Sequence, residues 1–280
     1  MQIVHTKKEV REHVAAARTE RKRIGLVPTM GALHEGHLSL VRVAVDQSDF
    51  VVVTIFVNPT QFGPGEDLDS YPRDLDSDAA KVAELGADLV FAPGAGEMYA
   101  PDACTVVSVE TLTEGLCGAH RPGHFDGVTT IVCKLFNVVR PDRAFFGRKD
   151  YQQLVVIRRM VRDLDIPVEV IGLSTVREDD GLALSSRNRY LSERQRAVAP
   201  KLHEALIVGA DAARQGATAA EVERTVASRL GEEPLFDVQY VRAVDPDTLQ
   251  PLGDEPRPML IAAAAYLGDT RLIDNVVVEG

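Results

Sequence analysis

The sequence predicts an α/β protein in which a doubly wound parallel sheet is followed by a smaller C-terminal α+β domain. Over residues 1–175, short β-branched segments alternate with apolar residues at helical spacing, which is the pattern of right-handed βαβ units. The run Val51–Val57 is continuously apolar, as is typical of a strand covered on both faces. From about Thr175 onward the alternation gives way to a polar connector and a mixed helical and strand-like region.

The elements of the first domain can be assigned in order. Thr6 and Glu9 fit a capping box, which predicts an opening helix through about Arg18. Strands are predicted at 24–27, 51–57, 88–91, 144–146 and 168–171. Helices are predicted after the first two strands and before the last, from the apolar sets Leu38, Val41 and Val45; Ala79, Val82, Ala83 and Leu85; and Leu154, Ile157, Val161 and Leu164. Residues 1–175 are therefore predicted to form a Rossmann-like domain.

The second predicted domain covers residues 176–280. A polar connector leads to Ser192 and Gln195, which fit a capping box opening one Ala-rich helix that ends near Gly216. Another helix and the strand-like segments 236–240, 259–261 and 271–273 follow. This length is enough for a small α+β domain, which we expect to act as a lid.

Composition excludes several classes of function. The 280 residues carry a net charge of −11, which argues against nucleic acid as the main partner because duplex binding draws on basic surface. The chain starts without the apolar core of a secretory signal and has no apolar run long enough to span a membrane. Cys104, Cys117 and Cys133 lack CxxC spacing, so free thiols are favoured over zinc or disulfides. We expect a cytoplasmic protein.

Two histidines follow the first predicted strand, at the start of a helix. His34 and His37 lie three residues apart and so share one face, with Gly36 between them. Imidazole donors at the positive end of a helix suit the charge that develops when an α-phosphate is attacked and pyrophosphate leaves. A bare His-x-x-His is more often a pair of surface or capping histidines, but its position after a strand, with Gly31 and Gly36, favours the functional interpretation.

Polar groups follow other predicted strands, where a doubly wound sheet binds its ligand. The amides of Asn58–Gly63 suit hydroxyl and carboxylate recognition. In Gly147–Gln153, Lys149 can reach phosphate, and Asp150 can cap a helix or bind a ribose hydroxyl. The connector segment Leu184–Asn188 carries two hydroxyls and a guanidinium that can close over a triphosphate. Neither GxxxxGK[ST] nor GxGxxG occurs, which argues against a P-loop or a dinucleotide site.

The acidic stretch Glu66–Asp78 allows two interpretations. Carboxylates bind hard cations, but Mg²⁺ in ATP enzymes is held mostly by phosphates and water. A solvated loop and helix start is favoured over a metal site, and no metal-ligating residue is predicted.

These strings together resemble one known family. His-x-Gly-His, with a Ser-Ser-Arg loop about 150 residues later, resembles the HIGH and KMSKS pair of the adenylate-forming nucleotidyltransferase superfamily. PTMGALHEGH, FVNPTQF, RPGHFDGV, RPDRAFFGRKDYQQL and LSSRNRYLS, in this order, resemble the pantoate–β-alanine ligases, or pantothenate synthetases. The resemblance runs from about Ile24 to Ser192 and continues weakly to Arg271–Asn275.

The resemblance implies a reaction and a partner set. Members of the family use ATP and Mg²⁺ to condense (R)-pantoate with β-alanine through a pantoyl adenylate. The products are pantothenate (vitamin B5), for coenzyme A biosynthesis, with AMP and pyrophosphate. It also implies that the large domain, residues 1–175, binds ATP and pantoate, and that a homodimer forms through this domain.

The resemblance further implies site residues. The implied ATP-binding residues are Met30, Gly31, Ala32, Leu33, His34, Glu35, Gly36, His37, Gly147, Arg148, Lys149, Asp150, Val176, Leu184, Ser185, Ser186 and Arg187. The implied catalytic residues among them are His34, His37, Lys149, Ser185, Ser186 and Arg187. Gln61 and Gln153 are implied to bind the substrates pantoate and β-alanine, although Gln153 also fits as a capping-box partner of Asp150. Arg121 and His124 match a string near the site, where a structural role is equally in keeping with the sequence.

Two positions depart from the family pattern, which commonly has Glu at Arg148 and Met at Leu184. Leu for Met is a near-isosteric change, whereas Arg148 reverses a charge beside Lys149. Two other functions stay open at this point. One is a nucleotidyltransferase that adenylylates a phosphate acceptor, and the other is a non-catalytic nucleotide-binding protein.

Overall fold

The computed structural model describes residues 1–253 and 258–279, and the chain divides into two compact units. The first unit holds Met1–Glu110, Arg121–Arg148 and Val156–Ser174, and the second holds Thr111–His120, Lys149–Val155 and the chain from Thr175 onward. Two internal segments thus group with the C-terminal part, which no local sequence pattern signals. The functional roles given to residues 1–175 and 176–280 stay predictions.

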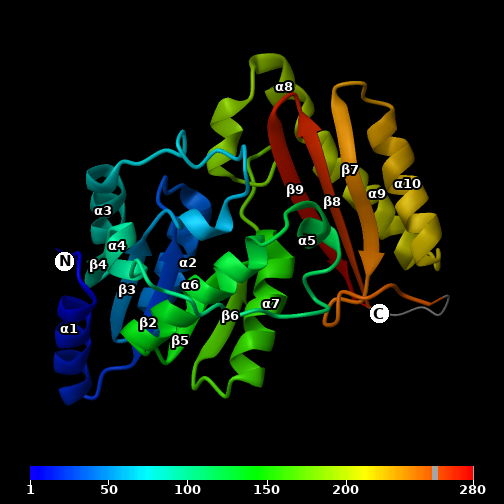
Figure 1. Ribbon diagram of the computed structural model, residues 1–280. Helices are drawn as coiled ribbons and strands as arrows, with labels where there is room; N and C mark the ends of the chain where they lie inside the picture. The colour runs from blue at the N-terminus through cyan, green and yellow to red at the C-terminus, as the bar shows by residue number, and fades with distance from the viewer. Residues whose placement is uncertain (254–257, 280) are drawn as a thin grey trace. The chain divides into compact units, whose positions relative to one another are not determined.

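A six-stranded parallel sheet organises the first unit (Figure 1). Its strands are β1 (Gln2–Val4), β2 (Ile24–Thr29), β3 (Phe50–Ile55), β4 (Leu89–Phe91), β5 (Arg143–Gly147) and β6 (Glu169–Leu173), in the order β1-β4-β3-β2-β5-β6. All pairs are parallel, so the doubly wound prediction is confirmed. The predicted strand at 51–57 starts and ends earlier, and β1 was missed because three residues are too few to display a period.

Helices cover the apolar strands of this unit. They are α1 (Lys7–Thr19), α2 (Glu35–Gln47), α3 (Leu75–Glu84), α4 (Ala95–Met98) and α6 (His124–Val139), with the 3-10 turn η1 (Pro59–Gln61). The 3-10 turn η2 (Arg148–Asp150) and helix α7 (Tyr151–Asp163) are divided between the two units, and α7 belongs to the first unit from Val156 onward. The Thr6–Glu9 capping box of α1 is confirmed. One core cluster joins Leu40 and Val41 of α2 and Val82 of α3 to Val27, Val53 and other strand residues. Helix α6 was not predicted, although its polar residues Asp126, Thr130, Lys134 and Asn137 recur at helical spacing opposite a buried apolar face.

The strand order reverses direction at β2. From β2 the chain builds outward to β3 and β4, and β5 then returns to the other side of β2 and continues to β6. In such sheets ligands bind beyond the carboxyl ends of the strands at this switch point. The residues that follow β2 begin at Met30, and Arg148 follows β5.

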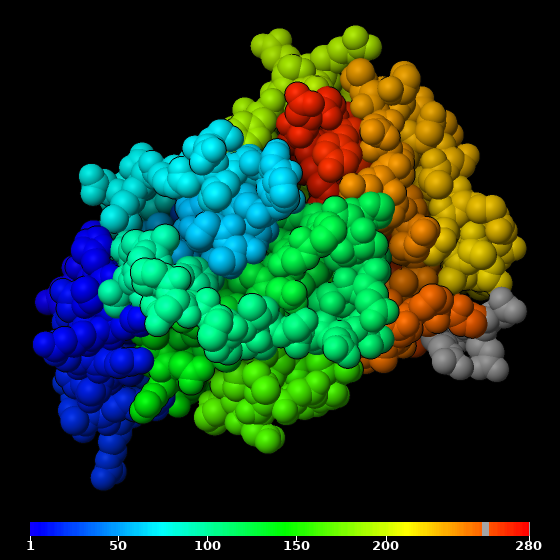
Figure 2. All heavy atoms as spheres, viewed as in Figure 1, coloured from blue at the N-terminus to red at the C-terminus, as the bar shows by residue number. Residues whose placement is uncertain are grey.

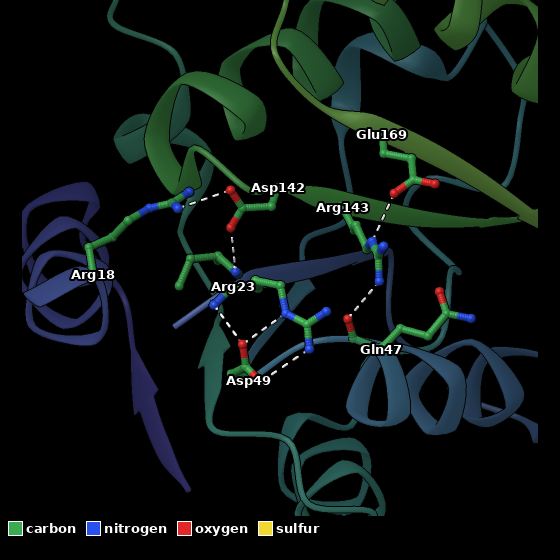
Figure 3. A network of polar contacts seen from close by, with 8 residues as sticks. Arg18, Arg23, Gln47, Asp49, Asp142, Arg143 and Glu169 are labelled. Atoms are coloured by element: carbon green, nitrogen blue, oxygen red, sulfur yellow. Dashed lines mark hydrogen bonds and ion pairs between the residues drawn. The ribbon is translucent and has the colours of Figure 1, made fainter. Parts of the chain in front are cut away.

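Ion pairs lie at the opposite end of the same sheet, where the strands begin (Figure 3). Asp142 accepts from Arg18 at 2.9 Å and from the backbone N–H of Ile24 at 2.6 Å. The hydrogen bond from Arg23 lowers the pKa of Asp49 to about 2. These contacts join the starts of neighbouring strands, so this end serves stability.

An antiparallel sheet organises the second unit. Its strands β7 (Phe236–Val244), β8 (Met259–Leu267) and β9 (Thr270–Val278) lie in the order β7-β8-β9. The helices and turns are α5 (Leu116–His120), η3 (Ser186–Tyr190), α8 (Glu193–Val198), α9 (Lys201–Arg214) and α10 (Ala219–Gly231). Leu206, Val226 and Ile261 belong to the core between helices and sheet, and α10, in yellow, lies beside β7, in orange (Figure 2).

The single helix predicted from Ser192 to about Gly216 is wrong. The Ser192–Gln195 capping box is confirmed, but α8 ends at Val198 and α9 starts at Lys201. Pro200 has no backbone N–H with which to continue the ladder of α8, and its fixed φ suits the start of a new helix. In the described parts of the chain, 1–253 and 258–279, no helix combines the length and apolarity needed to cross a bilayer.

Candidate active site

The loop after β2 has a shape that a buried carboxylate stabilises. Gly31 and Ala32 adopt positive φ values of 85° and 52°, which turns the chain sharply between β2 and α2. The carboxylate of Asp78, on α3, accepts from the backbone N–H of Ala32 at 2.7 Å and from that of Leu33 at 2.8 Å. Lys81 lies 3.5 Å from Asp78 and donates to the Leu33 carbonyl at 3.0 Å.

Asp78 corrects part of the prediction for the acidic stretch. The favoured interpretation was a solvated loop and helix start, yet Asp78 is only 1% exposed. Its two hydrogen bonds go to residues 45 and 46 positions away, which no local pattern reveals. Over residues 1–253 and 258–279, no cluster of three or more His, Cys, Asp or Glu residues is arranged to hold a metal ion.

His34 and His37 share the amino end of α2. His34 is the N-cap, and its Nδ1 accepts from the Gly36 N–H at 3.2 Å. The Nδ1 atom of His37 lies 3.5 Å from the backbone N–H of His34, and the two ring centroids are 4.2 Å apart. Because Nδ1 acts as the acceptor in each ring, a neutral imidazole carries its proton on Nε2. The histidines thus cap the helix through one nitrogen and can donate to an anion through the other.

An amide cluster orients Gln61 on the 3-10 turn after β3. Asn58 is buried and donates to the side chain of Gln61 at 3.1 Å and to the Gly127 carbonyl at 3.1 Å. Its Oδ1 accepts from Tyr99 at 2.7 Å and from Thr60 at 3.0 Å. Burial raises the pKa of Tyr99 despite its hydrogen bonds with Thr60 and Asn58, so the phenol stays a donor. The side-chain amide of Asn58 therefore uses both of its N–H donors and both lone pairs of its oxygen in hydrogen bonds within the protein.

The other end of Gln61 is held by the string that contains Arg121 and His124. His124 Nδ1 donates to the Gln61 carbonyl at 2.7 Å, and its Nε2 accepts from Arg121 at 2.9 Å. Arg121 also donates to both oxygens of Glu66, at 2.8 and 2.6 Å. Burial works to raise the pKa of Glu66, but the hydrogen bonds and charge of Arg121 outweigh it and leave that pKa lowered. Arg121 and His124 therefore position Gln61.

The segment after β5 is held from within the second unit. The Lys149 carbonyl accepts from Asn275 Nδ2 at 2.8 Å. One turn on, the buried Gln152 side chain accepts from the Cys117 N–H at 2.9 Å and donates to the carbonyls of Leu112 and Gly115 at 2.8 and 2.9 Å. Sequence reasoning missed Gln152, although a polar residue on the apolar side of α7 was a usable signal.

The connector loop with Ser185 and Arg187 is also ordered. A bridge pairs Arg177 with Ala183, and Leu184 N–H donates to the Val176 carbonyl at 3.0 Å. Ser185 is the N-cap of η3, and its hydroxyl accepts from the Arg187 N–H at 3.3 Å. This segment is therefore a small hydrogen-bonded hairpin rather than an extended linker.

Comparison with known proteins identifies the family. The family model for pantoate-beta-alanine ligase matches residues 2–277. The chain belongs to this family. It is 56% identical over 280 residues to the pantothenate synthetase of Moorella thermoacetica, covering 100% of this chain and 99% of that protein.

Solved structures of the family agree with this fold. The crystal structure of pantothenate synthetase from Thermus thermophilus has a TM-score of 0.95 at 50% identity and covers 100% of both chains. The pantoate-beta-alanine ligase from Francisella tularensis, complexed with beta-gamma ATP and beta-alanine, has a TM-score of 0.80 at 34% identity. It covers 99% of this chain and 97% of that one.

The implied residues of the pantoate–β-alanine ligase family divide between the two units. The first unit carries Met30–His37, Gln61, Gly147 and Arg148, and the second carries Lys149, Asp150, Gln153, Val176 and Leu184–Arg187. Within the first unit, Gln61 Nε2 donates to Met30 Sδ at 3.1 Å, which joins the loops after β2 and β3. The side chains of Ala32 and Leu33 are buried, and their backbone N–H groups donate to Asp78, so these residues can offer a ligand only their backbone carbonyls. Glu35 pairs with Arg42 on α2.

Proposed function

We propose that this ligase-family enzyme condenses (R)-pantoate with β-alanine through a pantoyl-adenylate intermediate, with ATP cleaved to AMP and pyrophosphate. The product would be pantothenate, for coenzyme A biosynthesis. The observation that carries the proposal is the His34–His37 pair at the amino end of α2, directly beyond β2 at the switch point of the sheet. Family membership over residues 2–277 supplies the substrates.

In the first half-reaction, a pantoate carboxylate oxygen attacks the α-phosphorus of ATP, and pyrophosphate leaves with the electron pair of the broken P–O bond. No proton has to move in this step. The Nε2–H groups of His34 and His37 are suited to donate to phosphate oxygens as negative charge builds on them. The positive end of the α2 dipole acts in the same direction.

Pantoate is proposed to bind at Gln61 and Gln153. Gln61 is held at its backbone carbonyl by His124 and at its side chain by Asn58. A side chain whose rotamer is fixed before the substrate arrives spends less entropy on binding. Gln153 lies half-buried on the first turn of α7.

Lys149, Ser185, Ser186 and Arg187 are proposed to complete the ATP site, with Gly147, Arg148, Asp150, Val176 and Leu184 beside them. Lysine and arginine supply charge to phosphates, and arginine adds planar donor geometry. Mg²⁺ is proposed to arrive with ATP, since it is usually held by phosphates and water together with one or two carboxylates.

In the second half-reaction, the β-alanine nitrogen attacks the acyl carbon of the adenylate, loses protons to form the amide, and AMP leaves. An acyl adenylate hydrolyses if water reaches it, so we propose that residues 176–280 act as a lid that excludes water. We also propose a homodimer that works in the cytoplasm, since symmetric dimers are the commonest oligomers.

Isotope exchange tests the reaction class. The enzyme is incubated with ATP, pantoate, Mg²⁺ and labelled pyrophosphate, without amine. Label should return to ATP only when pantoate is present, and added β-alanine should then release AMP and pantothenate. Release of ADP and phosphate would disprove the proposal, because the intermediate would then be an acyl phosphate. Exchange without pantoate would favour a nucleotidyltransferase.

A further inference from the structure

Two consecutive residues of β9 each bind one of two cationic segments of the second unit. One segment follows β5 and carries Lys149, and the other is the connector loop that carries Ser185 and Arg187. Asn275 donates to the Lys149 carbonyl at 2.8 Å. Asp274 accepts from Arg177 through both guanidinium nitrogens, at 2.6 and 2.9 Å. Both β9 residues are buried, with Asp274 4% and Asn275 9% exposed. Because successive side chains of a strand point to opposite faces of its sheet, and Asp274 and Asn275 pair with β8 in continuous register, the two residues reach the two segments from the two faces of the sheet.

The Asp274 contact extends to the loop with Ser185 and Arg187. Arg177, besides its ion pair, donates to the Gly181 carbonyl at 3.1 Å and bridges to Ala183. Burial works to raise the pKa of Asp274, but His203 and Arg177 outweigh it, so that the pKa is lowered and the carboxylate stays charged. The base of the hairpin that ends at Ser185 is therefore anchored to β9 by an ion pair.

The Asn275 contact is not explained by the needs of the strand. The backbone pairing of β9 with β8 places Asn275 opposite Ala262, and asparagine is disfavoured in strands. A buried amide without partners is costly, since its donors and acceptor lose water. The Lys149 carbonyl is a partner that accounts for an amide donor at this position. A carboxylate of the same shape could only accept and would face that carbonyl oxygen-to-oxygen.

We propose that Asn275 is a positioning residue for Lys149, and that the Asp274–Asn275 pair fixes the spacing between Lys149 and the Ser185–Arg187 loop. The inference rests on the proposed function, in which both segments bind the phosphates of ATP. Two cations that share one polyanion must be held at its spacing, because a misplacement of about 1 Å can cost about 100-fold in rate. Adjacent residues of a single strand provide such a fixed spacing, and Gln152 holds the next turn of the Lys149 segment in place.

The test compares Asn275→Ala and Asn275→Asp with Val276→Ala. The control removes apolar volume from the neighbouring position of β9, which packs against the core, and leaves the amide in place. Calorimetry gives the Kd for Mg·ATP, and pantoate-dependent pyrophosphate exchange gives the KM for ATP and for pantoate. Thermal unfolding is measured for every variant.

Both Asn275 variants should raise the Kd and KM for ATP by about 3- to 10-fold, the range expected for loss of one hydrogen bond, and leave the KM for pantoate unchanged. Val276→Ala should lower the Tm with ATP binding within about twofold of wild type. A purely structural role would lower the active fraction without raising the KM for ATP alone. In a Lys149→Ala background, adding Asn275→Ala should change ATP binding by less than about twofold, because coupled residues are not additive.

Equal ATP affinities for the Asn275 variants and Val276→Ala would overturn the inference. A full Asn275→Ala effect in the Lys149→Ala background would also overturn it, because the amide would then act through another group. Absence of pantoate-dependent exchange in the wild type is a separate result. It would remove the proposed function, while the Mg·ATP calorimetry would still decide whether Asn275 positions Lys149.

Discussion

Gly127 and Thr60 touch so closely that a β-carbon at position 127 would lie 2.3 Å from the carbonyl oxygen of Thr60. The first turn of α6 therefore packs directly on the backbone of η1, which carries Gln61. The Asn58 amide spans the same contact by donating to the Gly127 carbonyl. Helix α6 thereby fixes the position of η1, the proposed pantoate-binding turn.

Gly127→Ala should shift η1, because the clash is with backbone atoms that cannot rotate away. We expect a loss of stability of about 1–3 kcal/mol, as for overpacked cores, and a raised KM for pantoate with a smaller change for ATP. Denaturant unfolding and steady-state kinetics measure both effects. Gly96→Ala is the matched control, since a β-carbon there meets nothing within 4 Å. Equal behaviour of the two variants would contradict the close contact.

Asp78→Asn should loosen the loop between β2 and α2. The amide retains one acceptor oxygen for two backbone donors, Ala32 N–H and Leu33 N–H, which leaves one of them unpaired in a buried place. We expect a loss of about 1–3 kcal/mol together with slower pyrophosphate exchange, since His34 follows directly. Asp76→Asn, exposed on the same helix, should change neither property appreciably. Unchanged exchange in Asp78→Asn would show that the loop keeps its shape without the carboxylate.

His37→Ala should fold normally and lose most adenylation. Removal of one preorganised donor to developing charge typically costs about 10²–10³ in rate. Pyrophosphate exchange and thermal unfolding are measured side by side, with His13→Ala on α1 as the control. Near-wild-type exchange would remove His37 from the proposed chemistry.

The sequence motifs of the proposed site and most strands of the parallel sheet could be predicted, because both depend on residues that are close together in the sequence. Val51–Val57 identifies a buried strand by itself, and both the Thr6–Glu9 and Ser192–Gln195 capping boxes are confirmed within four residues of sequence. The strand order that places β2 at the switch point comes from the structure, since alternation and handedness predict a parallel sheet but do not decide on which side of β2 the later strands lie.

The sequence could not predict hydrogen bonds between residues that lie far apart in the chain. In the sequence Asp78 is one acid among many in a polar stretch, and only the structure shows that it accepts from the backbone N–H groups of Ala32 and Leu33. Asn275 and Lys149 are 126 residues apart, so their hydrogen bond has no local signature. The segment Gly147–Gln153 is one motif in the sequence, but the structure divides it, with Arg148 in the first unit and Lys149 in the second.

That division bears on the charge departure at position 148. Arg148 is exposed, whereas Lys149 is partly buried and held through its carbonyl by Asn275. We therefore expect Arg148→Glu to change the KM for ATP by less than Lys149→Ala does. Steady-state kinetics at saturating pantoate and β-alanine measure both. A larger effect of Arg148→Glu would mean that this enzyme builds its phosphate site differently from its family.

Acid should weaken the hold on Gln61 through Glu66. Burial works to raise the pKa of Glu66, but the hydrogen bonds and charge of Arg121 lower it below its ordinary value. A carboxyl with a depressed folded pKa contributes stability that is fully present above its unfolded pKa and is lost as pH falls through the folded pKa. The wild type should therefore lose this contribution below about pH 5, and Glu66→Gln should lack it at every pH. We expect the two free energies of unfolding to differ by on the order of 1 kcal/mol at pH 7 and to converge in acid. Urea titrations from neutral pH into acid measure this difference.

The same substitution should also affect substrate binding. The KM for pantoate should rise in Glu66→Gln, because Arg121 loses the partner that orients it toward His124 and Gln61. Parallel pH profiles for the two proteins would show that Glu66 is not the group that titrates.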